Sequence, residues 1–413
     1  MIIVKRTSGT SDWRVYHRGA NGGSSPHNYS FKLNDTSAQG FGALWNTTAP
    51  TSTQFTVAND TDTNASGSTY VAYLFAHNNN DGGFGTDGSD IIKCGSYTGN
   101  GSSQVINLGF EAQFVLYKAV ADLPSYGGEG WNILDTMRGM PTGGEDAKYL
   151  VANTTAAEAT FNSSYGARAH ATGFEVFGGA FGSNYNGNDY IYMAIRRGGM
   201  ATPTAASDVF NIDTFGSTGD GAAPAYRSSF PVDMGIYGIT SGTADRYIAS
   251  RLTGPQYLRM NATNAQADGG SDYAFDFNNG WWNSTSTAAT YVSYMWTRAR
   301  GYFDVVTYPG TGSAKTVSHN LSVTPEMMLV KSRSASALWR WYFSSLGATK
   351  NFYMPNDEAS VTQTAVWNDT APTSSVFTVG DSTDTNFNNR DYIAYLFATV
   401  AGVSKFGSFT QSG

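Results

Sequence analysis

Short apolar runs recur along this chain at wide and nearly regular spacing. The run "YVAYLFA" from Tyr70 returns as "YIAYLFA" from Tyr392, and weaker copies begin at Tyr190 and Tyr291. The leading tyrosines lie 120, 101 and 101 residues apart. Apolar or alternating runs of this length are typical of β-strands. The pattern therefore predicts four domain-sized repeats, each of which contains a copy of the same strand.

Two further landmarks share this period. A short strand and a glycine turn follow each core strand, and their sequences are "IIKCGSYTGNG" from Ile91, "VFNIDTFGSTGDG" from Val209, "YFDVVTYPGTG" from Tyr302 and "VSKFGSFTQSG" from Val403. The strands "MIIVK", "FVLYK" and "MMLVK" then lead to Trp13, Trp131 and Trp339, a tryptophan that the third repeat lacks. We place the repeats at residues 1–90, 91–208, 209–301 and 302–402, with 403–413 as the opening strand of a further repeat.

The residues between the apolar runs favour turns and strands over helices. Only 14% of the residues are charged, so the surface is made polar by Asn, Thr, Ser and Gly, whose short side chains compete with helical hydrogen bonds. We expect an all-β fold in which each repeat is an antiparallel β-sandwich, jelly-roll-like, of roughly seven strands. The sequence leaves open whether neighbouring repeats merge into larger sandwiches.

Charge and hydropathy exclude several classes of partner. The net charge is −7 and the Lys and Arg residues form no cluster, which argues against nucleic acid. No apolar stretch approaches the roughly 20 residues of a membrane-spanning helix. The first residues show no signal-peptide pattern, so an extracellular location would require another route, such as release by lysis. The lone cysteine, Cys94, occupies a repeat position held elsewhere by Ile212 and Val305, which predicts a small buried hydrophobe.

The chain carries few signs of catalysis. It has no G-x-S-x-G, H-E-x-x-H or P-loop motif, and its five histidines have no metal-ligand spacing. Carboxylates that could act in pairs on a glycosidic bond cluster in the second repeat: Glu111, Glu129, Asp135 and Glu145. Nothing in the sequence places any two of them at the required separation. We therefore predict that the chain is not an enzyme.

Two loops place oxygen-bearing side chains at alternating positions. They are "NDTDTN", with Asp60, Asp62 and Asn64, and "DSTDTN", with Asp381, Asp384 and Asn386. Alternating oxygen ligands are how a loop binds Ca²⁺, although the glycine and the bidentate glutamate of a typical calcium loop are missing. We favour ordinary hydrogen-bonded turns without a cofactor. Calcium ligands are the alternative.

A pair of tryptophans in the third repeat is the candidate ligand site. Trp281 and Trp282 stand in "FNNGWWNSTST", beside Asn279 and Asn283. Sugar rings stack on aromatic faces that amides flank, so we consider these four residues as glycan-binding candidates. We expect the two rings to be at least partly exposed or to face another subunit. The alternative to glycan binding is that they pack against the next repeat or against another subunit.

The landmarks together resemble a known repeat. "MIIVKRTSGTSDWRVYHRGANGG", "WNTTAPTSTQFTV", "YVAYLFA" and "GSYTGNGS" are similar to a β-domain of tail-fibre and other virion structural proteins of marine tailed bacteriophages. The resemblance implies a homo-oligomeric virion appendage, extracellular after lysis, that contacts other virion proteins and host surface glycans. A purely architectural head fibre or filament without a ligand is the alternative, and a polysaccharide depolymerase is a third.

The phase of the repeats raises one structural question. The chain opens at a position that matches the middle of the fourth repeat, so the first repeat lacks an opening strand. An unpaired sheet edge favours pairing with another chain. Two arrangements are possible: a longer polypeptide supplies the strand, or "VSKFGSFTQS" of a neighbouring copy inserts there. We predict that Val403–Phe409 forms a strand and that the edge beside Ile2–Lys5 is covered from outside its own repeat.

Overall fold

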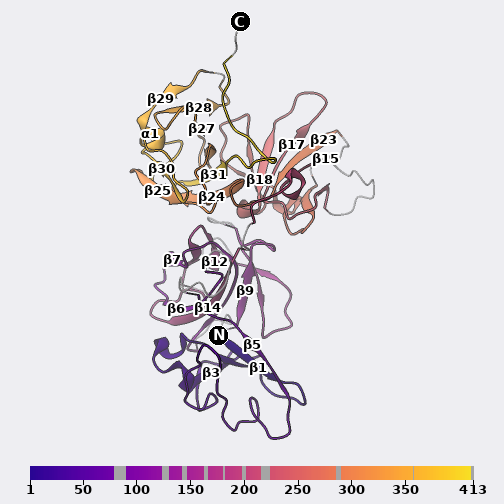
Figure 1. Cartoon of the computed structure of the whole chain (residues 1–413), viewed down its shortest axis with the longest axis vertical. Helices are drawn as coiled ribbons and strands as arrows, with labels where there is room; N and C mark the ends of the chain where they lie inside the picture. The colour runs from indigo at the N-terminus through magenta and orange to yellow at the C-terminus, as the bar shows by residue number, and fades with distance from the viewer. Residues whose placement is uncertain are drawn as a thin grey trace. The chain divides into compact units, whose positions relative to one another are not determined.

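The computed structural model describes residues 1–78, 90–122, 130–141, 147–161, 166–179, 182–197, 201–214, 224–284, 290–356 and 358–410. Within these ranges the chain consists almost entirely of short antiparallel strands, which confirms the predicted all-β sandwich fold. Each of the four large sheets is built from strands of one repeat (Figure 1).

Repeat 4 illustrates the arrangement. Its large sheet has the order β24-β31-β26-β27-β28-β29, and β25 pairs with β30 in a small second sheet. The bounds are β24 (Phe303–Pro309), β25 (Lys315–Ser318), β26 (Met327–Ser332), β27 (Trp339–Phe343), β28 (Lys350–Met354), β29 (Val361–Thr362), α1 (Thr364–Trp367), β30 (Val376–Val379) and β31 (Asp391–Phe397).

Repeat 2 follows the same order, β6-β14-β8-β9-β10-β11, with the second sheet β12-β13-β7. Its strands are β6 (Ile92–Thr98), β7 (Gln104–Asn107), β8 (Ala112–Ala119), β9 (Asn132–Asp135), β10 (Lys148–Val151), β11 (Ala159–Thr160), β12 (Gly166–His170), β13 (Gly173–Phe177) and β14 (Asp189–Arg196).

Repeat 3 has the order β15-β23-β17-β18-β19-β20 and the second sheet β16-β22-β21. Its elements are η3 (Ala206–Asp208), β15 (Phe210–Thr214), β16 (Tyr226–Arg227), β17 (Met234–Ile239), β18 (Tyr247–Ser250), η4 (Arg251–Thr253), β19 (Gln256–Arg259), β20 (Ala267–Asp268), η5 (Gly270–Asp272), β21 (Tyr273–Ala274), β22 (Gly280–Asn283) and β23 (Tyr291–Trp296).

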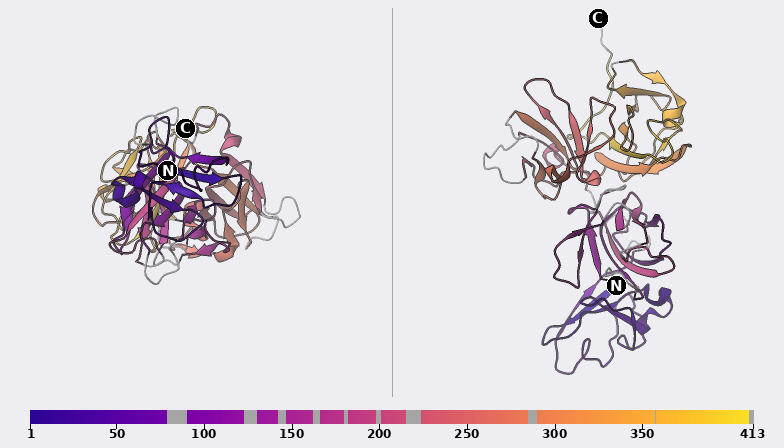
Figure 2. Two further views of the ribbon diagram at one scale, coloured as in Figure 1. Left: turned by 90° about the horizontal axis from the view of Figure 1, so that it is seen from below. Right: turned by 180° about the vertical axis from the view of Figure 1, so that it is seen from behind.

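Repeat 1 has five strands where the other repeats have six in the large sheet, in the order β4-β3-β2-β1-β5. Its elements are β1 (Ile2–Arg6), β2 (Arg14–Tyr16), η1 (Ala20–Gly23), η2 (Pro26–Asn28), β3 (Tyr29–Lys32), β4 (Gly40–Phe41) and β5 (Tyr70–Leu74). Figure 2 shows this sheet in indigo and the sheets of repeat 4 in orange and yellow.

The repeated apolar run is the strand next to the sheet edge. In repeats 2 to 4 it is β14, β23 or β31, and it pairs on one side with the opening strand and on the other with the "MMLVK"-type strand. In β31, where both edges are paired and Tyr392 to Phe397 are all buried, the run is continuously apolar. In repeat 1 the same strand, β5, pairs with β1 and with no other strand of the described ranges.

Two predictions about the repeat phase are wrong. The edge beside Ile2–Lys5 is covered within its own repeat, because Ile2 pairs with Tyr16 of β2 and with Leu74 of β5. Among the described residues, the far side of β5 has no partner strand. Residues 403–410 form no strand, and only Ser404 makes an isolated bridge, to Val400. A strand requires a partner strand, and within the described residues this segment has none.

The chain divides into two compact units, which are Met1–Met140 with Asp146–Gly199, and Met200–Gly413 with Pro141–Glu145. The first holds repeats 1 and 2 up to Gly199, and the second holds repeats 3 and 4. No helix in the described ranges is long and apolar enough to cross a membrane.

The two repeats of the first unit share one apolar core. Ile3, Val15 and Phe31 of repeat 1 pack in a single cluster with Leu116 and Met193 of repeat 2. Cys94 belongs to the same cluster and is fully buried, as its repeat position predicts. Neighbouring repeats in this unit therefore pack together through their apolar residues, while each keeps its own large sheet.

Candidate functional site

Trp281 does not lie in an exposed loop, so the prediction for this residue is wrong. It stands on β22, between β16 and β21, and its exposed fraction is 0%. The indole stacks on Tyr226 at 5.3 Å and on Phe275 at 5.3 Å, and its Nε1 donates to Ser293 Oγ at 3.0 Å. A ring enclosed in this way cannot stack on a sugar without unfolding of repeat 3.

The neighbours of Trp281 follow the alternation of a strand. Trp282 points to the other face of β22 and is half-buried, whereas Asn283 is fully buried. Gly280 has φ +150°, and a Cβ at this position would collide with the backbone carbonyl of Tyr226, so the strand approaches its neighbour closely. Asn279 is exposed at the start of the strand. Of the four candidates, only Trp282 and Asn279 offer surface to a ligand.

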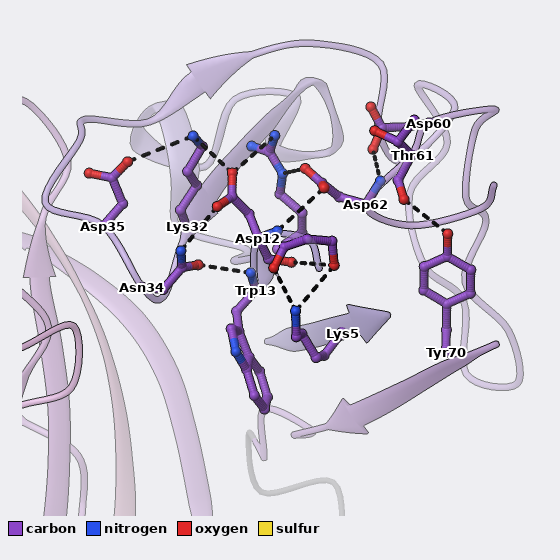
Figure 3. A network of polar contacts seen from close by, with 12 residues as sticks. Lys5, Asp12, Trp13, Lys32, Asn34, Asp35, Asp60, Thr61, Asp62 and Tyr70 are labelled. Carbon is purple, nitrogen blue, oxygen red and sulfur yellow. Dashed lines mark hydrogen bonds and ion pairs between the residues drawn. The ribbon is translucent and has the colours of Figure 1, made fainter. Parts of the chain in front are cut away.

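The acidic loops are held by ion pairs in the same way in both repeats. Asp62 accepts from Arg14 Nε at 2.8 Å and from the backbone N of Asp12 at 3.3 Å (Figure 3). Asp384 accepts from Arg340 Nε at 2.9 Å and Nη2 at 2.7 Å, and from the backbone N of Leu338 at 3.0 Å. Both carboxylates are therefore already occupied by the arginine of the tryptophan strand.

The other calcium candidates also make hydrogen bonds that fix a turn or lie at the surface. Asp60 Oδ1 accepts from the backbone N of Asp62 at 2.9 Å, and Asp381 and Asn64 are exposed. Asn386 is buried, accepts from Thr311 N at 2.8 Å, and donates to the carbonyls of Ser313 and Gly380, each at 2.6 Å. Within the described ranges, no three His, Cys, Asp or Glu side chains are placed to share a metal ion.

The network around Asp12 shows how repeat 1 balances its charges (Figure 3). Asp12 pairs with Lys32 at 2.9 Å, and Asn34 Nδ2 donates to it at 3.0 Å. The hydrogen bonds from Asn34 and Lys32 lower the pKa of this carboxyl and favour its ionised form. Asn34 Oδ1 in turn accepts from the backbone N of Trp13 at 2.8 Å, which fixes the start of β2.

Two of the four candidate carboxylates of repeat 2 lie in the part of the chain that the structure describes. Asp135 is bound by Arg138, through its Nε at 2.6 Å, and Glu111 is buried. Glu129 and Glu145 lie outside the described residues. The prediction that the chain is not an enzyme remains a prediction.

A joint between consecutive repeats is the recurring polar site of the molecule. In the first unit, Lys118 Nζ at the end of β8 donates to the carbonyl of Thr36 at 2.6 Å. Trp131, which precedes β9, donates through Nε1 to the carbonyl of Lys32 at 2.7 Å. The backbone N of Gln39 donates to the carbonyl of Val120 at 2.9 Å. Repeat 2 thus inserts a lysine and a tryptophan into the loop after β3 of repeat 1.

The second unit repeats the joint atom for atom. Lys331 Nζ donates to the carbonyl of Thr263 at 3.0 Å, and Trp339 Nε1 donates to the carbonyl of Arg259 at 2.9 Å. The backbone N of Gln266 donates to the carbonyl of Arg333 at 2.7 Å. These residues occupy the same places in repeats 4 and 3 as their counterparts do in repeats 2 and 1. We call the lysine and tryptophan the plug, and the loop that accepts them the socket.

The plug side chains are removed from solvent. Lys118 and Trp131 are each 1% exposed, and Lys331 and Trp339 are each 0% exposed. Burial lowers the pKa of Lys331 to about 8, and the nearby Asp384 opposes this shift. Buried ammonium and indole N–H groups are costly unless they are bonded, so the carbonyls of the socket fix the position of one repeat on the next.

Repeat 3 has lost both plug residues together. The strand register places Gly238 where repeat 4 has Lys331, and Arg246 where it has Trp339. The boundary between the two compact units falls before this repeat. Repeat 1 keeps its plug, Lys5 and Trp13, but Lys5 Nζ bonds to Ser11 of its own repeat, at 2.5 Å to the carbonyl.

The two socket loops share a sequence motif that the pattern of predicted strands does not reveal. Residues 34–39 read "NDTSAQ" and residues 261–266 read "NATNAQ", which have the common form N-x-T-x-A-Q. The threonine and glutamine of this motif contribute backbone groups to the joint. In the second unit the Gln266 side chain also accepts from Arg333 Nε at 2.8 Å, and the recurrence of the motif is the sequence signal that could have revealed the joint.

Comparison with known families gives one match. The sequence model of a family described as a domain of unknown function, DUF7483, matches residues 1–197 and 261–413. The unmatched residues between these segments include most of repeat 3, which has lost the plug. No curated protein matches the chain.

Proposed function

The chain belongs to the DUF7483 family, whose function is unknown, and we propose that it is a structural protein of a tailed-phage virion whose repeats stack into a fibre-like appendage. The observation that carries the proposal is the joint. The same plug enters the same socket in both units.

A joint of this kind suits a chain that builds length. Each plug residue is buried in the preceding repeat, so a repeat is positioned by its neighbour, as in other repeat proteins. The resemblance of repeats 1 and 4 to virion repeats supplies the setting. In that setting the protein is extracellular after lysis and contacts copies of itself and other virion proteins.

The burial of Trp281 favours the purely architectural form of this proposal over glycan adhesion. Trp282 and Asn279 remain as surface for a sugar, but a half-buried ring beside one exposed amide is a small platform. Glycan-array binding by the intact chain that is lost in Trp282→Ala and kept in Trp13→Ala would restore the adhesive form.

The location of the protein tests the proposal directly. Peptides of this chain should appear in mass spectra of gradient-purified phage particles, and antibodies against it should label an extended appendage in electron micrographs. Detection of the chain only in the lysate, with purified particles free of it, contradicts the proposal. Sustained release of reducing sugar from host polysaccharide would point to the depolymerase instead.

A further inference from the structure

The unpartnered edge of β5 has the geometry of an acceptor for one more strand. Phe75 N donates to the carbonyl of Met1 at 2.9 Å and Thr7 N donates to the carbonyl of Thr69 at 2.8 Å, so the odd-numbered residues of this strand bond toward β1. The N–H and C=O groups of Tyr70, Ala72 and Leu74 therefore point to the open side. In repeat 4 the equivalent residues of β31 face β24.

The segment 405–410 has the sequence of a strand that fills this position elsewhere. It reads "KFGSFT", and β6 of repeat 2 contains "KCGSYT", residues 93–98. There β6 pairs with β14 and places Gly95 opposite Tyr192 and Tyr97 opposite Tyr190. If this register is transferred to the first repeat, Gly407 lies opposite Ala72 and Phe409 lies opposite Tyr70.

The same segment leaves repeat 4 through the turn that starts an opening strand. Ser404 forms an isolated bridge with Val400, and at the equivalent place before β24 Phe303 forms one with Ala299. Just beyond this turn Phe406 N donates to Thr399 Oγ1 at 3.1 Å and the Phe406 ring lies 5.9 Å from that of Phe397, whereas Phe409 is 95% exposed. An aromatic side chain exposed to this extent on a strand-like sequence suggests a missing partner.

Repeat 1 has counterparts of the two aromatic rings that the Phe409 ring would contact. In repeat 4 the equivalent Tyr308 stacks on Tyr392 at 5.4 Å and contacts Phe377 edge-on at 5.8 Å. The counterparts of those two residues in repeat 1 are Tyr70 and Phe55, and both are only partly buried. Leu74, at the far end of the open edge, is 63% exposed.

We propose that the edge of β5 binds residues 405–410 of a second copy of this chain as an added antiparallel strand. Each copy carries one donor and one acceptor, so the contact is heterologous and joins copies head to tail. The inference rests on the edges of the chain itself and goes beyond the proposed function. The head-to-tail pairing can be absent although the protein is found on particles. Equally, the pairing can occur although the protein is not found on particles.

Proline variants of the full chain distinguish this pairing from other contacts. In the transferred register the N–H of Gly407 points to β5 and the N–H of Ser408 points away from it. Pro309, which has no N–H, stands at the end of β24 in a position of the second kind. Sedimentation velocity over a range of concentrations should show association of the unmodified chain, before and after refolding from urea. Gly407→Pro should abolish it and Ser408→Pro should preserve it.

The acceptor is tested in the same way. Ala72→Pro removes an N–H that faces the open edge and leaves the bonds to β1 intact, so it should also abolish association, while Ala72→Thr should not. Association that survives both Gly407→Pro and Ala72→Pro would overturn the proposal. A chain that remains monomeric at every concentration and after refolding would also overturn the proposal. This holds whether the edge of β5 is then covered within the same chain or left for another polypeptide.

Discussion

Repeats 1 and 4 carry closely similar sequences in different surroundings. "WNTTAPTSTQFTV" and "WNDTAPTSSVFTV" differ at few positions, and "YVAYLFA" and "YIAYLFA" differ at one. In repeat 4 the second stretch is fully buried, with Tyr395 1% and Leu396 0% exposed, whereas in repeat 1 Tyr73 is 46% and Leu74 63% exposed. The sequence of a strand thus does not decide its burial, because burial depends on which strands are present beside it.

The difference extends beyond the edge strand. Val376–Val379 forms β30 because β25 pairs with it, while the matching residues 54–57 of repeat 1 form no strand. The plug differs too, since Trp339 is enclosed by repeat 3 and Trp13 is only partly buried against Tyr73. The neighbouring segment completes each of these features, so mutations at matched positions should have unequal effects.

The largest difference is expected for the plug tryptophan. Trp339→Ala removes a buried ring and its bond to Arg259, so it should cost about 3–5 kcal/mol of unfolding free energy in the second unit. Trp13→Ala, at the matched position, should cost less than about 1.5 kcal/mol because the ring is not enclosed. Urea unfolding of both variants measures this, and equal losses would show that the joint contributes nothing.

The arginine–aspartate pair should come next. Asp384→Ala leaves Arg340 buried without its bidentate partner, which should cost about 3 kcal/mol or more. The Arg14–Asp62 pair is more accessible and has a single short contact, so Asp62→Ala should cost about 1 kcal/mol. The change in urea midpoint of the two variants tests this ranking, and an equal or larger loss for Asp62→Ala than for Asp384→Ala would contradict it.

Acid should destabilise both units through buried histidines. Burial lowers the pKa of His17 to about 3 and that of His319 to about 4, both below the ordinary value of 6.5. The unfolded state therefore binds more protons, and stability that is complete above pH 6.5 is lost as pH falls toward these values. Each group should contribute a loss of about 1.4 kcal/mol per pH unit in that window. His319→Gln should flatten the pH dependence of the second unit, and an unchanged slope would contradict this.

A smaller difference in stability is expected for Asn386, whose side-chain amide holds the glycine turn of repeat 4 by hydrogen bonds. Asn386 bonds to Thr311, Ser313 and Gly380, so Asn386→Ala should cost about 1–3 kcal/mol. The matched Asn64 is exposed, and Asn64→Ala should stay within about 0.5 kcal/mol. Thermal unfolding of the two variants gives the comparison, and a larger loss for Asn64 than for Asn386 would refute it.

Chelation should have no effect on either repeat. Asp62 and Asp384 are bound by arginines, so treatment with a chelator should leave the melting temperature unchanged. A fall in melting temperature that added calcium reverses would instead support calcium binding by Asp60, Asp62, Asn64, Asp381, Asp384 and Asn386.

Periodicity was enough to predict the sandwich repeats and the buried position of Cys94, because apolar runs and turn residues are local signals. For Trp281 the prediction from local sequence is wrong. "NNGWW" resembles a loop by composition, yet Trp281 and Trp282 alternate inward and outward on a strand whose close approach Gly280 permits. The joint was not predicted either, because its lysine and tryptophan donate to backbone carbonyls, which every residue type has. The segment after Val403 has strand sequence but no partner strand within the described residues, and pairing is a tertiary property.

Amide hydrogen exchange on β5 and β31 tests the central claim most directly. In a chain without residues 403–413, the amides of Tyr70, Ala72 and Leu74 should exchange rapidly, while those of Tyr392, Ala394 and Leu396 should be protected by β24. A synthetic peptide of residues 403–413 should slow exchange at the β5 positions alone. Equal protection of the two strands before the peptide is added, or no change at Ala72 and Leu74 after it, would contradict the account.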